Sequence, residues 1–171
     1  MCNNVVMSNK QLFKKYELAE SFIGLHFFSG QFWEMYLEQV EMRCKTPNRY
    51  LIILRKVLEI PHYSYSNFFA KWLQCIEDIR DLKQVALFAP QEELWKRLKI
   101  DIFLGSRRGP HLEDAKKQLK KFTKELYMTI QYQVLEVYNL FEIHLKTHYY
   151  CSPESLIDQN QVLAWCKYLD Y

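Results

Sequence analysis

The hexapeptide FWEMYL at residues 32–37 decides the fold, because the similar hexapeptide FFAKWL stands at residues 68–73. The offset between the two copies is 36 positions, counted from Trp33 to Phe69. Related residues return near the C-terminal end as AWCKYL, residues 164–169. The shared kernel is an aromatic residue, two intervening residues, a second aromatic residue and a leucine. Self-similarity at this period indicates a repeated supersecondary unit.

Each kernel places its apolar side chains on one side of a helix. Residues at positions i and i+3 lie on the same helical face, and the leucine that follows widens the apolar stripe. A helix pair cannot bury such a stripe alone, so neighbouring pairs should stack. An irregular bundle of similar amphipathic helices is the alternative. We expect the following residues to form the repeat core: Trp33, Tyr36 and Leu37; Phe69, Trp72 and Leu73; Trp165, Tyr168 and Leu169.

Helical periodicity extends over most of the chain. Apolar residues recur at spacings of three and four in residues 10–23, 32–42, 50–60 and 66–79. A further helix should run from Pro90 to about Leu104, and another should begin at Gln159. The longest helix is predicted from Leu112 to Tyr149, where one apolar stripe continues throughout. The fold class predicted is all-α, a right-handed superhelical solenoid of antiparallel helix pairs.

The composition agrees with a helical protein and argues against several other classes. The 171 residues are 49% apolar, 25% charged and 16% aromatic, with only 4 Gly and 5 Pro. So few glycines argue against a Gly-rich phosphate loop. The 5 cysteines are scattered and form no CxxC pair, which favours reduced thiols over a zinc ribbon. No uncharged apolar run approaches the roughly 20 residues that a membrane helix needs, so no membrane partner is expected.

The kernel and the segment LRKVLEIP behind its first copy (residues 54–61) resemble the HAT (half-a-tetratricopeptide) repeat of RNA-processing scaffolds. The similarity narrows to the HAT-repeat components of the fungal U1 snRNP. It rests on LFKKYE at residues 12–17, GLHFFSG at 24–30, the Lys-rich segment 114–124 and WCKYLDY at 165–171. It covers essentially the whole chain, although members of that family are several times longer.

The resemblance implies a non-catalytic scaffold that pairs with a related HAT-repeat subunit and binds other U1 snRNP proteins. It implies a nuclear role in pre-mRNA splicing, at recognition of the 5′ splice site. Contacts with U1 snRNA and pre-mRNA would be mainly indirect, and no cofactor is implied. Within the kernels, Phe69 departs from the repeat pattern by replacing the first tryptophan.

We expect residues 1–171 to form a single HAT-repeat segment with an incomplete repeat at each end. The clearest break is GSRRGP at residues 105–110, which holds two of the 4 glycines. The kernel at Trp165 opens a repeat whose second helix would lie beyond Tyr171. Apolar residues left partly exposed there predict self-association of the isolated chain.

Candidate catalytic and metal sites are weak. His144 and His148 are four apart with Cys151 just beyond, a spacing that zinc ligands can have. No second ligand cluster accompanies them, so an ordinary helix surface is favoured and no metal is expected. Glu136 and Glu142 fall on different helical faces, and no GxSxG, Walker or HExxH motif occurs. We therefore predict no enzyme activity.

A basic cluster is the most distinctive polar feature. Lysines four apart on one helix repel each other, so such rows are unfavourable without a counter-charge. The cluster can be a solvated face, a contact with an acidic protein surface, or a contact with RNA phosphates. Direct RNA binding through the basic face of the long helix is thus the alternative function, although the net charge is only +3 and base stacking is not indicated. The residues concerned are Arg107, Arg108, Lys116, Lys117, Lys120, Lys121 and Lys124.

Overall fold

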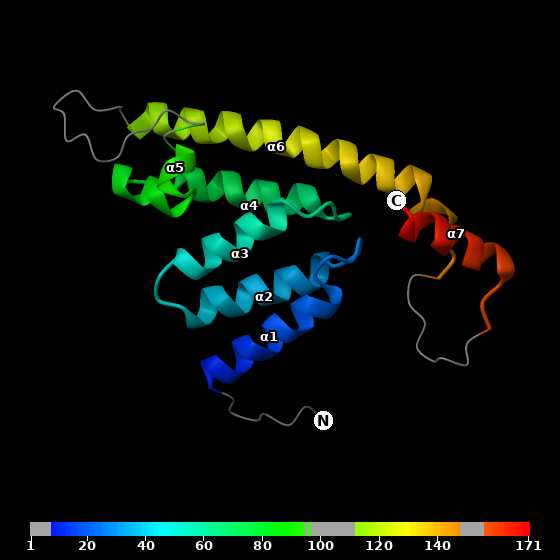
Figure 1. Cartoon of the computed structure of the whole chain (residues 1–171). Coiled ribbons are helices and arrows are strands. Elements are labelled where there is room, and N and C mark those ends of the chain that lie inside the picture. The colour runs from blue at the N-terminus through cyan, green and yellow to red at the C-terminus, as the bar shows by residue number, and fades with distance from the viewer. Residues whose placement is uncertain (1–7, 95, 97–111, 148–155) are drawn as a thin grey trace. The chain divides into compact units, whose positions relative to one another are not determined.

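The computed structural model describes residues 8–94, 96, 112–147 and 156–171. Every regular element in these residues is a helix, so the predicted all-α class is confirmed (Figure 1). In chain order the elements are α1 (Asn9–Ile23), α2 (Gly30–Arg43), α3 (Asn48–Leu58), α4 (Tyr65–Glu77), the 3-10 helix η1 (Leu82–Leu87), α5 (Gln91–Glu93), α6 (Leu112–Leu140), the 3-10 helix η3 (Glu142–His144) and α7 (Gln159–Leu169).

The chain groups into two compact units, residues 1–130 and residues 131–171, whose border falls inside α6. The break expected at residues 105–110 lies outside the described residues, as does most of the helix expected up to Leu104. The organisation as a single repeat segment therefore stays a prediction. None of the described helices is long and apolar enough to cross a membrane.

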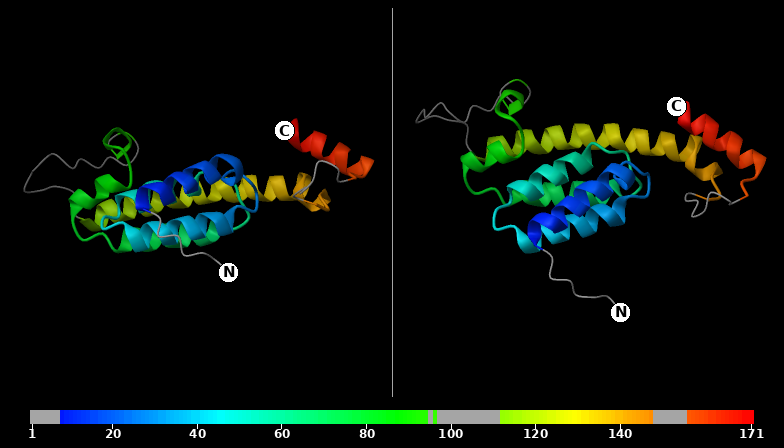
Figure 2. Two further views of the ribbon diagram at one scale, coloured as in Figure 1. Left: turned by 90° about the horizontal axis from the view of Figure 1, so that it is seen from below. Right: turned by 60° about the horizontal axis from the view of Figure 1, so that its bottom comes forward.

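Helices α1 to α4 of the first unit run back and forth beside one another (Figures 1 and 2). The helix α1 contacts α2, α2 contacts α3, and α3 contacts both α4 and η1. Their connections are short, which favours antiparallel neighbours. Because α3 lies against both α2 and α4, each of the two kernel helices has a neighbour on which to bury its apolar stripe.

The connection between α1 and α2 is fixed by hydrogen bonds to Gly24. The indole Nε1 of Trp33 donates to the Gly24 carbonyl oxygen at 3.0 Å, and the Ser29 hydroxyl donates to the same oxygen at 3.1 Å. A Cβ atom at Gly24 would lie 2.6 Å from the Glu20 carbonyl oxygen and 3.1 Å from Cζ2 of Trp33. Only glycine therefore allows this close approach, and the first kernel tryptophan anchors the turn that precedes its own helix.

The first kernel lies in the core of the first unit. Trp33 is 0% exposed, and Tyr36 and Leu37 are also buried. The Tyr36 ring stacks on the ring of Tyr16 from α1, with centroids 4.7 Å apart and planes 10° from parallel. Aromatic stacking of this kind adds specificity to the burial of apolar area.

The second kernel is only partly buried. Phe69 and Trp72 lie in the core, and the Trp72 ring meets Phe88 edge-on at 5.0 Å between centroids. Leu73 was expected in the core as well, but it is 39% exposed. One residue along a helix turns the side chain by about 100°, so Leu73 points away from the side on which Phe88 covers Trp72.

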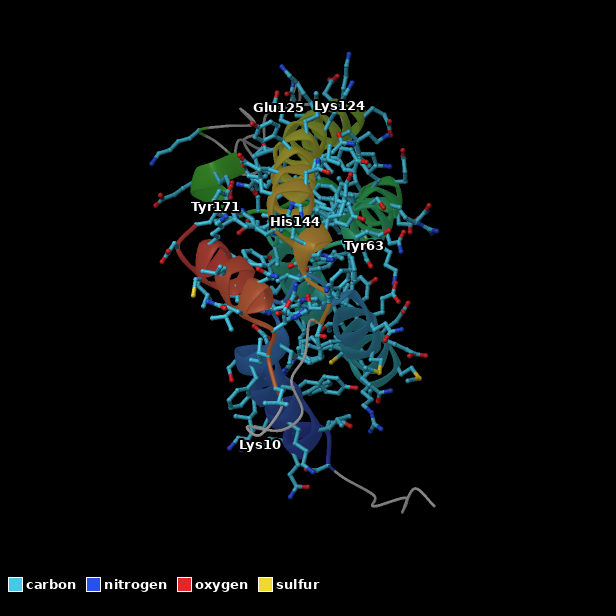
Figure 3. All side chains as sticks on the ribbon, turned by 90° about the vertical axis from the view of Figure 1, so that its right-hand side faces the viewer. Lys10, Tyr63, Lys124, Glu125, His144 and Tyr171 are labelled. Atoms are coloured by element: carbon cyan, nitrogen blue, oxygen red, sulfur yellow. The ribbon has the colours of Figure 1, made fainter. Side chains whose placement is uncertain are left out.

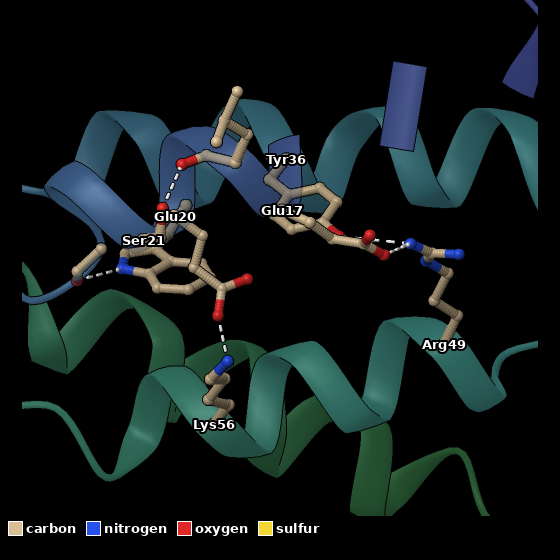
Figure 4. A network of polar contacts seen from close by, with 9 residues as sticks. Glu17, Glu20, Ser21, Tyr36, Arg49 and Lys56 are labelled. Carbon is tan, nitrogen blue, oxygen red and sulfur yellow. Dashed lines mark hydrogen bonds and ion pairs between the residues drawn. The ribbon is translucent and has the colours of Figure 1, made fainter. Parts of the chain in front are cut away.

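Polar contacts join α1 to α3 on the outside of the first unit (Figure 4). Nη2 of Arg49 lies 2.8 Å from a carboxylate oxygen of Glu17 and donates to the Tyr36 hydroxyl at 3.3 Å. Farther along α3, Lys56 forms an ion pair with Glu20. Exposed pairs of this kind contribute at most about 1 kcal/mol each, so they set the register of α1 on α3 rather than the stability of the stack.

The helix predicted from Leu112 to Tyr149 is too long, because α6 ends at Leu140. Phe141 leaves the helical conformation at φ −129° and ψ −61°, and η3 follows. The Gln161 side chain of α7 then forms hydrogen bonds with two backbone groups. It accepts from the Lys146 N–H at 2.8 Å and donates to the His144 carbonyl oxygen at 3.1 Å. Leu145 remains buried beyond this turn, so the apolar spacing persists although the helix does not.

The C-terminal kernel packs within the second unit. The Tyr168 ring is parallel to Phe141 with centroids 4.8 Å apart, and its hydroxyl donates to a Glu142 carboxylate oxygen at 2.7 Å. Burial and that carboxylate raise the pKa of Tyr168 above its ordinary value. Trp165 is half-buried, but Leu169, expected in the core, is 81% exposed. It closes the last turn of α7, where no further described element covers it.

Candidate protein-binding groove

A groove of about 430 Å³ lies between α4 and the first part of α6, within the first unit. Its walls are mainly apolar, and none of its lining residues is acidic. They are Ser66, Phe69, Ala70 and Leu73 from α4, and Lys120, Thr123, Lys124 and Tyr127 from α6. The groove therefore combines an apolar floor with a basic edge, and it contains the exposed kernel leucine.

Aromatic packing holds the floor of the groove. The ring of Tyr127 meets Phe69 edge-on, with centroids 5.1 Å apart and planes at 89°. The ring of Tyr65 also contacts that of Tyr127, with centroids 5.3 Å apart and planes at 40°. The Thr123 hydroxyl donates to the Leu119 carbonyl oxygen of its own helix at 2.8 Å, so its hydrogen donor is already satisfied. The remaining surface offers carbon atoms more than hydrogen-bonding groups.

Two of the predicted contact lysines are used inside the protein. Lys116 is only 9% exposed, and its Nζ donates to the Glu77 carbonyl oxygen at 2.8 Å. That oxygen lies at the C-terminal end of α4, where a helix attracts cations. Lys120 binds the Glu77 carboxylate directly, and this hydrogen bond is the main reason that the pKa of Glu77 lies below its ordinary value. The expectation that Lys116 is exposed for contact with a partner is therefore wrong. Its side chain instead joins α6 to α4.

Of the other five predicted contact residues, three are exposed lysines on α6 and two are arginines outside the described residues. Lys117, Lys121 and Lys124 are exposed, and the structure records no ion pair for them among the residues it describes. Their spacing of four and then three places them on one side of α6. Lys124 also lines the groove and lies beside Glu125 on the surface of α6 (Figure 3). Arg107 and Arg108 lie outside the described residues.

The possible zinc ligands do not come together in the part of the chain that is described. His144 is exposed in η3, while His148 and Cys151 lie outside the described residues. No group of three His, Cys, Asp or Glu side chains that could hold a metal ion occurs among the described residues. The groove between α4 and α6 remains the strongest candidate site, since it unites a kernel residue with the basic cluster.

Comparison with known proteins confirms the resemblance seen in the sequence. Residues 2–74 match the family model of the PRP39 N-terminal HAT repeat. The chain is 56% identical over 170 residues to the U1 small nuclear ribonucleoprotein component PRP42 of Saccharomyces cerevisiae, covering 99% of this chain and 31% of that protein. It is 24% identical over 158 residues to pre-mRNA-processing factor 39 of Schizosaccharomyces pombe, covering 87% of this chain and 25% of that protein. The chain thus spans less than a third of either relative.

Proposed function

Because the chain closely resembles a HAT-repeat segment of a U1 snRNP component, we propose that it is a non-catalytic scaffold in pre-mRNA splicing. The observation that carries the proposal is the 56% identity to PRP42 over nearly the whole chain. The stacked amphipathic helices of the first unit agree with it. Such stacks present extended surfaces to other proteins. In this role the chain acts in the nucleus during recognition of the 5′ splice site.

The partners proposed are proteins rather than RNA. They are a related HAT-repeat subunit and other proteins of the U1 snRNP, with U1 snRNA and pre-mRNA reached mainly through them. The groove between α4 and α6 supports this choice, because its lining is mainly apolar. An apolar concave surface buries favourably against another protein, whereas phosphates need cations and bases need exposed aromatic faces.

Purification from nuclear extract tests the scaffold role. The tagged protein should recover a particle with U1 snRNA and several proteins. After nuclease treatment the protein partners should remain bound, because the proposed contacts are between proteins. Recovery of cytosolic metabolic proteins without U1 snRNA would overturn the proposal, and loss of every protein with the RNA would favour the alternative function.

The alternative, direct RNA binding by the basic face of α6, predicts a measurable salt dependence. Three exposed lysines, Lys117, Lys121 and Lys124, give a slope of log affinity against log salt of at most about 2 to 3, taking about 0.7–0.9 for each phosphate. We expect weak binding of a single-stranded 15-nucleotide RNA with a slope in or below this range. Fluorescence anisotropy across a salt series measures it. Submicromolar affinity in near-physiological salt, lost when all three lysines become Glu, would contradict the protein-only view.

Self-association of the isolated 171-residue chain is a further prediction. Apolar side chains stand exposed on α1, among them Leu18 and Phe22 one turn apart, as well as Leu169 on α7. Exposed apolar patches of this kind associate. We expect the weight-average mass in sedimentation equilibrium to rise with concentration, and Phe22→Glu or Leu169→Glu to reduce the rise. A constant monomer mass across the concentration range would show that these faces do not associate.

A further inference from the structure

We propose that the groove between α4 and α6 binds an acidic amphipathic segment of a partner protein. The segment would bury apolar side chains against Leu73 and Tyr127 and place carboxylates beside Lys121 and Lys124. The inference rests on the proposed scaffold function and names the partner chemistry of this one site.

The dimensions of the groove fit a short segment. Its lining on α6 extends from Lys120 to Tyr127. At a rise of about 1.5 Å per residue this is roughly 10 Å, or two helical turns. Two apolar side chains one turn apart on a helical segment lie about 5–6 Å apart, so both fit along that length. An occupant therefore needs only one apolar face of two turns.

The apolar wall calls for an apolar counterpart. Leu73 is the exposed member of a kernel whose aromatic partners, Phe69 and Trp72, are buried. Across the groove, Tyr127 is held in place by its edge-on contact with Phe69. This pre-formed surface requires little rearrangement on binding, which lowers the entropic cost of association.

The charges around the groove select an acidic partner. At one end Lys120 is neutralised by Glu77, so its charge is already satisfied. One turn farther along α6 Lys124 is exposed, with Lys121 three residues before it on the same side of the helix, and the structure records no ion pair for either among the residues it describes. No carboxylate lines the groove itself. Electrostatic complementarity therefore favours carboxylates beside Lys124.

A single-stranded RNA fits this surface less well than a peptide. The Tyr127 ring contacts both Phe69 and Tyr65, so it is committed to packing rather than free to stack on a base. On the α4 side the lining is mainly the carbon atoms of Phe69, Ala70 and Leu73, which give phosphates no hydrogen bonds. Amphipathic helices, in contrast, are recognised by apolar grooves flanked by charge.

The test uses designed peptides and the 171-residue chain. The probe is a fluorescein-labelled 14-residue peptide with leucines at i, i+3, i+4 and i+7 and glutamates elsewhere. Its controls are a peptide with lysine in place of every glutamate and a scrambled acidic peptide without the leucine spacing. Fluorescence anisotropy should show binding of the probe that weakens with salt, and markedly weaker binding of both controls. Equal binding of the scrambled acidic peptide would overturn the proposed apolar recognition.

Variants of the chain locate the binding. Lys121→Glu with Lys124→Glu should weaken probe binding by about tenfold or more, since repulsion replaces attraction at the rim. Leu73→Asp should do the same, and because Leu73 is partly exposed the variant should keep its helical circular dichroism. The matched control is Lys10→Glu with Lys14→Glu, an equal charge change on exposed positions of α1, which should leave the affinity unchanged. Equal losses in both double variants would overturn the assignment to the groove.

Two outcomes separate this inference from the scaffold function. If the Lys121→Glu, Lys124→Glu protein still recovers every U1 snRNP protein from nuclear extract and the probe does not bind the unchanged chain, the groove inference fails and the scaffold function stands. If the probe binds as expected but no U1 snRNP particle is recovered, the scaffold function fails. Complete displacement of the bound probe by equimolar 15-nucleotide RNA would identify the surface as an RNA site and overturn the inference.

Discussion

Replacing Trp33 with alanine is expected to lower the free energy of unfolding by about 3–5 kcal/mol, the loss typical of a large aromatic side chain removed from a core. The side chain is 0% exposed and its ring packs on Phe32 at 5.0 Å between centroids. Its Nε1 also donates to the Gly24 carbonyl oxygen, so the variant loosens the connection between α1 and α2 as well. Urea unfolding followed by circular dichroism measures the change.

Two matched variants show whether this loss belongs to the kernel. Trp33→Phe removes the hydrogen bond but keeps an aromatic ring, and the Ser29 hydroxyl still donates to Gly24. We expect it to cost clearly less than the alanine variant. Leu73→Ala removes a partly exposed kernel residue and should cost about 1 kcal/mol or less. A Trp33→Ala loss as small as that of Leu73→Ala would mean that the kernel does not support the stack.

The kernel spacing predicted the helices of the first unit well because periodic apolar residues report burial directly. It could not separate Trp72 from Leu73, since both belong to one apolar stripe and only the position of Phe88 decides which is covered. The helix η1 was missed because it is short. Its start still carries a capping-box signal, with Asp81 and Gln84 exchanging hydrogen bonds, that could have marked it.

The basic cluster illustrates what a helical pattern leaves open. Spacing of three and four places lysines on one face, but it carries no information about residues far away in the chain. Lys116 and Lys120 reach Glu77, about forty positions earlier, only because α6 packs on α4. Glu77 stands 36 positions after Glu41, the same offset as between the two kernels, and this repetition favours a structural role for it. Tyr127 lies next to the predicted apolar stripe and not on it. The groove could therefore not be predicted from the sequence, because it depends on the contact between Tyr127 and Phe69 in the folded chain.

Acidification is expected to destabilise the protein through His62. This side chain, in the connection between α3 and α4, is 0% exposed, and neither ring nitrogen has a hydrogen-bond partner among the described residues. Its ring lies edge-on to Phe68 at 5.0 Å, and its Nδ1 lies 4.0 Å from the point where a Cβ atom on Gly30, the first residue of α2, would stand. Burial among these groups lowers the pKa of His62 to about 4, from 6.5.

The sign follows from proton binding in the two states. Between pH 6.5 and about 4 the unfolded chain holds a proton on His62 and the folded protein does not, so the free energy of unfolding falls as the pH falls. A pKa difference of this size corresponds to a loss of about 3 kcal/mol, complete near pH 4. Above pH 6.5 the imidazole is neutral in both states and His62 contributes no pH dependence.

Comparison of variants isolates this contribution from that of the carboxylates. His62→Leu replaces a buried ring without hydrogen bonds by an apolar group, which should cost little at pH 7 and gain relative stability as the pH falls. The difference in unfolding free energy between His62→Leu and the unchanged protein should therefore shift by about 3 kcal/mol between pH 7 and pH 4 in favour of the variant. If the curve for His62→Leu runs parallel to that of the unchanged protein, His62 is not held neutral by the fold, and the acid sensitivity must come from groups whose pKa is lowered, such as Glu77, which act at lower pH.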